Sequence, residues 1–362
     1  MRATLLLTLL LSFPGYAFDA ILSGSASVDY RFISGLNPQQ NPSPLGIAWL
    51  TFEVAQKVVA EVGHGVSFTV KACGGCHGLE VDQGFGEVRL KRFFNVRVGR
   101  LNVPFGEFTL RHDPANFTTP SKPLPYAMGD MLEYGREGFN LGIVPGPYVD
   151  NGVEAFGSFS LSATAQLDYA VYVVKGLAGD NDLDFARSRS YVDNNKSPAF
   201  GARVVLTGDD WAVGGSVSAG AYDPKDALWY VMGGLEFYAR VGRFVVRAEV
   251  LARRTDLDPA AEGYAFTLID SWFLKAGWYA QVDWSPRPEL TFIVRSDGLH
   301  RLGMPLPFTD LSQSAGVQRQ TAAMMVRTHE HLAVKLDYEL WTFVGAPFQT
   351  RHVARLGLVV GY

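Results

Sequence analysis

Residues 228–241 read LWYVMGGLEFYARV, and after a single glycine the chain continues as RFVVRAEVLARR over 243–254. In both stretches, every second side chain is apolar and most of those between are polar or charged. One side of the first stretch carries Trp229, Val231, Leu235, Phe237 and Ala239, and the other carries Tyr230, Glu236, Tyr238 and Arg240. A period of two residues is typical of β-strands. The pair therefore predicts a β-hairpin that turns at Gly242.

The same pattern recurs along the whole chain and predicts about 16 strands of 8–14 residues. Their expected ranges are 25–34, 46–59, 66–72, 80–90, 94–101, 153–161, 166–174, 199–206, 211–222, 228–241, 243–254, 271–284, 289–296, 321–328, 331–340 and 351–362. Short turns alternate with longer connections, as periplasmic turns and extracellular loops do in bacterial membrane barrels. If both termini are periplasmic, the extracellular connections are 35–44, 73–79, 102–150, 176–197, 255–270 and 297–317.

The composition favours a membrane barrel over a soluble protein. Glycine occurs 38 times, aromatic residues make up 13% and charged residues only 19% of the chain, and no run of about 20 apolar residues predicts a helical span. The final strand, RLGLVVGY, alternates and ends on an aromatic residue, as the closing strand of such a barrel does. The expected fold class is all-β: a transmembrane antiparallel β-barrel. A soluble sandwich explains the alternation, but not the asymmetry between turns and loops.

The N-terminal sequence and the net charge indicate where the protein is located in the cell and which partners it can have. Arg2, the apolar run 5–11 and the small residues before position 18 predict a secretory signal peptide over 1–17. The alternative, a membrane anchor, needs a longer apolar run. We therefore expect one exported domain, 18–362, in the bacterial outer membrane. The net charge of −4 argues against a nucleic-acid partner.

Charged side chains on one face of the strands predict a wet interior. A charge that faces lipid costs a few kcal/mol near the midplane. The expected lumen-lining residues are therefore Arg97, Arg240, Arg243, Arg247, Glu249, Arg253, Lys335 and Glu339. Two interpretations of these residues stay open: a solvated wall, or a lining that selects solutes by charge.

Three stretches resemble the phosphate-selective porin O and P family of outer-membrane porins. They are FNVRVGRLNVPFGEF (94–108), VDNGVEAFGSF (149–159) and QLDYAVYVVKGL (166–177), and the similarity covers about 80–177. Arg97, Gly99 and the Pro104-Phe105-Gly106 run match the first family motif, whereas Lys175 replaces the usual Asn of a later one. The resemblance implies a 16-stranded general or anion-preferring diffusion channel, often a homotrimer. A phosphate-binding lysine cluster is not matched.

The proline-rich connection 102–150 has no strand period and contains a helix-like stretch at 126–134. Long loops of porins often fold into the lumen as a constriction, and this connection is the best candidate. The alternative is an extracellular cap, in which Arg111, Lys122 and Arg136 are surface charges.

Both cysteines of the chain fall in one motif, Cys73-Gly-Gly-Cys76-His77. Cys-x-x-Cys-His is the attachment motif of haem c: the two thiols add to the haem vinyl groups and the imidazole binds the iron. A Cys73–Cys76 disulfide is the main alternative. A zinc site would need two more ligands, for which His64 and His112 are candidates, and a thioredoxin-like pair lacks its βαβ context.

Two functions from different classes follow. The first is a porin-like channel for small hydrophilic or anionic solutes, and whether its motif carries one covalent haem c or a Cys73–Cys76 disulfide stays open. The second is a haem-c electron-transfer barrel, whose partner would be a periplasmic or surface cytochrome. Candidates for a sixth iron ligand are His112, Met128 and Met131. No recognisable motif points to an enzyme.

Overall fold

The computed structural model confirms a closed antiparallel barrel of 16 strands. It describes residues 19–34, 47–75, 78–127, 131–134, 137–140, 142–179, 193–260, 270–303, 314–345 and 349–362. The expected signal peptide lies outside these residues. Among them, no helix has the length and apolarity needed to cross a bilayer.

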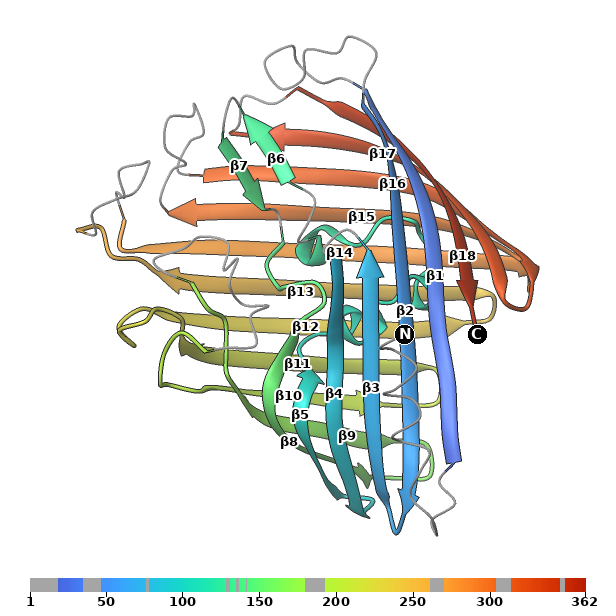
Figure 1. Ribbon diagram of the computed structural model, residues 1–362. Helices are drawn as coiled ribbons and strands as arrows, with labels where there is room; N and C mark the ends of the chain where they lie inside the picture. Colours follow the sequence, from blue (N-terminus) through green and yellow to red (C-terminus); the bar gives the residue numbers. More distant parts are fainter. Residues whose placement is uncertain are drawn as a thin grey trace, which may run out of the picture.

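Neighbouring strands pair in sequence order except where the chain enters a long connection after β5. The strands are β1 (Asp19–Ser34), β2 (Ile47–Gly63), β3 (Val66–Gly75), β4 (Gly78–Lys91), β5 (Phe94–Asn102), β8 (Val149–Ser160), β9 (Gln166–Val174), β10 (Ala199–Thr207), β11 (Trp211–Ala221), β12 (Trp229–Val241), β13 (Phe244–Asp256), β14 (Trp272–Arg287), β15 (Leu290–Gly303), β16 (Ser314–His329), β17 (Leu332–Val344) and β18 (Arg351–Gly361). Strands β1 and β18 pair over Ser25–Ser34 and close the barrel (Figure 1).

The connection between β5 and β8 contains elements of its own. Three 3-10 turns, η1 (Phe108–Arg111), η2 (Pro114–Asn116) and η3 (Leu124–Tyr126), are followed by a hairpin of β6 (Met131–Tyr134) and β7 (Glu137–Asn140). The helix-like stretch expected at 126–134 is therefore wrong. The prolines before η3 favour short turns, and β6 pairs with β7 instead of continuing a helix.

The two faces of the strands have opposite environments, which explains the alternation in the sequence. On β12, Leu235 is 69% exposed and the next residue, Glu236, only 7%. The exposed outer face is apolar, as a lipid-facing surface must be. Near the turn that joins β14 and β15, rings stack side by side on it: Phe244 on Trp284 at 6.4 Å and Trp284 on Phe292 at 5.6 Å. Such aromatic rows mark the membrane interface in barrels.

Two expected extracellular connections are shorter than the sequence indicated. The stretch 73–79 is the tip of a hairpin, because β3 continues to Gly75, which pairs with Gly78 of β4. The stretch 297–317 was expected to be a loop, but β15 continues to Gly303 and β16 begins at Ser314. Glycines and charged residues interrupt the alternation of apolar and polar side chains in these segments, so the sequence did not reveal that the strands continue through them.

Candidate functional site

The described residues 103–127 and 142–148 of the connection between β5 and β8 lie inside the barrel, and we call this part of the chain the lumen segment. Its hydrogen bonds reach inward-facing residues of strands on several sides of the wall. Lys71 of β3 contacts Asp113, Ser216 of β11 accepts from the amide of Gly106 at 3.0 Å, and Lys335 of β17 donates to the carbonyl of Pro114 at 2.6 Å. Only a segment that crosses the interior can make contacts on all these sides (Figure 1). It therefore constricts the lumen.

Glu249 of β13 is the anchor for the start of the lumen segment. Its carboxylate accepts hydrogen bonds from the amides of Glu107 and Phe108 at 3.0 and 2.9 Å. It also accepts from the hydroxyls of Tyr126 and Tyr279 at 2.5 and 2.6 Å. Burial and the nearby Glu249 charge raise the pKa of Tyr126 well above its usual value, so this hydroxyl keeps its proton and donates. A buried carboxylate is tolerated here because each oxygen is satisfied twice.

A network of charges on β15–β17 holds the middle of the lumen segment. Asp297 pairs with Arg295 at 3.1 Å and with Arg319 at 2.5 Å, and the three side chains are at most 1% exposed. Asp297 also accepts from the amide of Leu124, and Arg319 donates to the carbonyl of Lys122 at 2.6 Å. The network thus joins the barrel wall to the backbone of the lumen segment.

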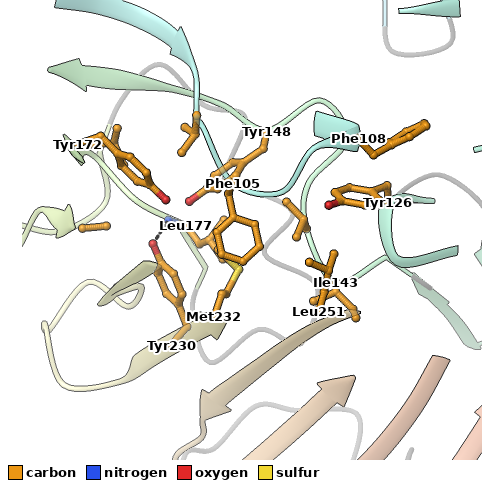
Figure 2. Close-up of a cluster of buried hydrophobic side chains, with 14 of the residues drawn as sticks. Phe105, Phe108, Tyr126, Ile143, Tyr148, Tyr172, Leu177, Tyr230, Met232 and Leu251 are labelled. Carbon is orange, nitrogen blue, oxygen red and sulfur yellow. Dashed lines mark hydrogen bonds between the residues drawn. The ribbon is translucent and has the colours of Figure 1, made fainter. Parts of the chain in front are cut away.

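Between these anchors, apolar side chains of the lumen segment pack against the wall of β9–β14. Figure 2 shows Tyr148 near Tyr172, Phe105 near Met232 and Ile143 near Leu251, whereas Phe108 lies beside Tyr126 of the same segment. The wall contributes Tyr172, Val174, Ala199, Tyr222, Tyr230, Met232, Leu251 and Tyr279. A packed apolar core inside a barrel fills the space that water would otherwise occupy. This side of the lumen is therefore closed.

Open space remains on the opposite side, along β1–β5 and β16–β18. A cavity of about 240 Å³ is bounded by β2–β5 and by the stretch Thr109–Asn116 of the lumen segment. A second cavity, of about 770 Å³, opens beside the short turns at 288–289 and 329–331. The two cavities share Lys57, Lys71, Asp113 and Asn116 in their linings. The two cavities therefore adjoin at these four residues, which we call the neck, and we call the two cavities together the passage.

Cationic side chains are prominent along this passage. Lys57, Lys71 and Arg97 line the smaller cavity, and Arg327 and Lys335 join the lysines in the larger one. Arg97 is held by Glu87 at 2.5 Å and Glu154 at 3.5 Å, with its guanidinium 4.1 Å from the ring centroid of Phe156. Acidic residues in the linings are Asp113, Glu154, Glu289 and Glu330.

The structure separates the expected lumen residues into three groups. Arg97 and Lys335 line the passage. Others face inward but have charged or lumen-segment partners: Arg247 pairs with Asp283 at 2.8 Å, Arg253 donates to the carbonyl of Ile143, and Glu339 pairs with Arg319 at 3.2 Å. Glu249, described above, belongs with them.

Arg240 and Arg243 form the third group, at the end of the barrel. Arg243 lies in the turn before β13, where it is exposed and donates to the carbonyl of Pro286 at 2.8 Å. Its expected place in the lumen wall is therefore wrong, because the alternation was extended across the turn. Arg240 lies next to the last residue of β12 and is exposed at the rim.

Of the cysteine motif, the structure describes Cys73, Gly74 and Gly75, whereas Cys76 and His77 lie outside the described residues. Cys73 is half-buried and pairs in register with Ala55 of β2 and Glu80 of β4. It shares the inward face of β3 with Lys71. Among the described residues, no three His, Cys, Asp or Glu side chains are grouped as a metal site would need.

The candidates for a sixth haem ligand are only in part described. His112 is buried in the lumen segment, with its Nε2 atom 3.0 Å from Lys122 Nζ. Met128 lies outside the described residues, and Met131 begins β6. His64, the other candidate for zinc, lies in the turn between β2 and β3, away from the hairpin tip that carries Cys73.

Sequence reasoning missed Lys57, Lys71 and Asp113, the residues of the neck. Lys57 and Lys71 lie in neighbouring predicted strands, 46–59 and 66–72. Had these two strands been paired in the correct register, the two lysines would have been placed opposite each other. No sequence signal indicated that Asp113 would fold back to them.

Comparisons with known proteins give the fold and nothing finer. No protein-family model matches the chain, and no curated protein matches its sequence. Solved structures do match: the outer membrane channel DcaP of Acinetobacter baumannii aligns with a TM-score of 0.60 at 10% identity, over 96% of this chain and 98% of that one. OmpF of Salmonella typhi, in complex with daunomycin, gives 0.60 at 9% identity, over 96% and 98%. OmpT, an outer-membrane protein of Vibrio cholerae, gives 0.58 at 8%, over 97% and 99%.

Proposed function

We propose that the protein is a water-filled channel of the bacterial outer membrane that passes small hydrophilic solutes. The observation that carries the proposal is the off-centre passage beside the anchored lumen segment. Its lining is polar and charged, whereas the outer face of the barrel is apolar. An interior of this kind in a barrel of this strand number is suited to diffusion of solutes in water.

We propose further that the passage favours anions. Lys57, Lys71, Arg97, Arg327 and Lys335 line it, while the acids nearest to Arg97 and Lys71 are already engaged in ion pairs. A pore lined by cationic side chains raises the local concentration of anions. Arg97 is fixed by two carboxylates and by two aromatic rings, Phe85 and Phe156, so its charge keeps a constant position.

Liposome swelling tests the diffusion of solutes. Vesicles that contain the refolded protein should swell in isotonic solutions of small sugars, at rates that fall with the size of the sugar. Vesicles that swell no faster than empty ones would contradict a diffusion channel.

We propose attachment of haem c as a second and separate possibility, on the strength of the Cys73-x-x-Cys76-His77 motif. Two thiols and an imidazole in this order are the donors that haem c requires. Haem would supply an electron-transfer centre; Cys73 would bind it from the inward face of β3. A haem stain after denaturing electrophoresis, from cells with cytochrome c maturation, should show a band that Cys73→Ala and Cys76→Ala abolish. Absence of the band in the unaltered protein would favour a disulfide.

A further inference from the structure

Two lysines face each other at the neck of the passage. Lys57 of β2 and Lys71 of β3 are direct partners in the antiparallel register, so their side chains leave the wall side by side. Directly opposed like charges destabilise a sheet. Such a pair is expected to persist where counter-charges or a function offset the repulsion.

Only one of the two lysines is neutralised by the protein. Lys71 contacts Asp113 of the lumen segment, and its Nζ atom lies 3.5 Å from Asp82 of β4. Lys57 makes no ion pair or hydrogen bond through its side chain with any of the described residues. The pair thus has a free cation beside one that is held by a carboxylate from the lumen segment.

The surroundings of the pair offer further polar groups. Asn116 lines both cavities together with the lysines and Asp113, and Ser25 lines the larger one. Ser25 is 3% exposed, yet its hydroxyl has no hydrogen-bond partner among the described residues. A buried hydroxyl without a partner is unfavourable, and a bound ligand or water would offset this cost. Ser25 sits on β1 opposite Ala55, two residues from the partner of Lys57.

We propose that Lys57 and Lys71 bind a small oxyanion, a carboxylate or a phosphate, at the neck. The carboxylate of Asp113 competes with this anion for Lys71. Without a bound anion, the Asp113 carboxylate forms an ion pair with Lys71. An anion that arrives at Lys57 exchanges with this carboxylate, crosses the neck and leaves when Asp113 returns. This inference rests on the proposed channel function and makes Asp113 a residue that sets affinity and residence time.

Competition predicts opposite effects for two conservative variants. Lys57→Gln removes the free cation and with it one charge-assisted hydrogen bond to the anion. The concentration of phosphate or acetate that blocks half of the chloride current should therefore rise by roughly tenfold. Asp113→Asn removes the competitor, so the same concentration should fall by a similar factor. Lys225→Gln, at an exposed lysine far from the passage, serves as the matched control and should change neither value.

The measurement is single-channel recording of the full-length protein in planar bilayers with chloride as the carrier and inorganic phosphate or acetate as the blocker. Block by phosphate alone, or by acetate alone, identifies which oxyanion the neck prefers. The proposal is overturned if Lys57→Gln leaves block unchanged, or if Asp113→Asn weakens it. If the unaltered protein forms no channel, the proposed function fails first; if it conducts without block by either oxyanion at millimolar concentration, only the neck site fails. Lys57 has no partner to lose, so its variant is expected to fold.

Discussion

At the scale of single residues, buried charged side chains of the barrel wall bind the backbone of the lumen segment. Glu249 is the clearest case, because one carboxylate satisfies four donors from three parts of the chain. The sequence indicated that Glu249 faces inward. It did not indicate its role, since the four donors come from residues up to 142 positions away and no local pattern reports such contacts.

Replacing Glu249 by glutamine should loosen the lumen segment. One acceptor oxygen becomes an amide donor, so two of the four donors lose their partner, at a cost of about 3 kcal/mol. We expect a lower free energy of unfolding in urea and a noisier, larger single-channel conductance. Glu61→Gln, near the end of β2 where the side chain is 50% exposed and lines neither cavity, is the control. An unchanged conductance in Glu249→Gln would contradict the anchoring role.

Replacing Gly106 by any residue with a side chain should destabilise the protein. Its φ of +70° lies in the left-handed region, and an added Cβ would lie 2.1 Å from the Tyr126 hydroxyl and 2.7 Å from Glu249. Gly106→Ala should therefore destabilise the protein by about 3 kcal/mol, from backbone strain and crowding together.

Gly242→Ala is the matched control for Gly106→Ala. Gly242 has a φ of +58°, but nothing lies within 4 Å of the added Cβ, so only the strain of about 1 kcal/mol remains. Urea unfolding followed by tryptophan fluorescence measures both. Equal losses in the two variants would mean that the space around Gly106 is not as tightly filled as its neighbours indicate.

At the scale of elements, the strands were predictable and the lumen segment was not. A period of two residues marks each strand because one face meets lipid and the other meets polar groups. The segment 103–148 has no such repeat: its conformation depends on where wall residues such as Asp297, Glu249 and Lys335 lie. The sequence therefore predicted a long connection over 102–150 and favoured a place in the lumen over an extracellular cap, but it misread 126–134, which includes β6, as helical.

Asp297→Asn should release the middle of the lumen segment. The substitution leaves the buried guanidiniums of Arg295 and Arg319 without their shared counter-charge, which typically costs about 3–5 kcal/mol. The amide of Leu124 also loses a charged acceptor. We expect faster proteolysis within 103–148 and a larger conductance than in the unaltered protein.

Asp210→Asn, in the exposed turn between β10 and β11, is the control for Asp297→Asn. Its side chain makes no hydrogen bond or ion pair within the part of the chain that is described, so stability should be unchanged. If Asp297→Asn behaves like Asp210→Asn, the charge network does not hold the segment.

At the scale of the whole molecule, the barrel interior is divided. One side is a packed apolar core and the other is a passage with a cationic neck. Strand count and inward charges were accessible from the sequence, since both follow from local alternation. The division was not, because it depends on which part of a long connection packs against which strands.

The measurement that tests this account most directly is the reversal potential of the protein in a planar bilayer with a tenfold KCl gradient. We expect discrete conducting steps, whose reversal potential has the sign of chloride preference, and a smaller preference in Lys57→Gln. Steps that favour potassium would contradict the cationic passage. A complete absence of steps from correctly folded protein would contradict the channel itself.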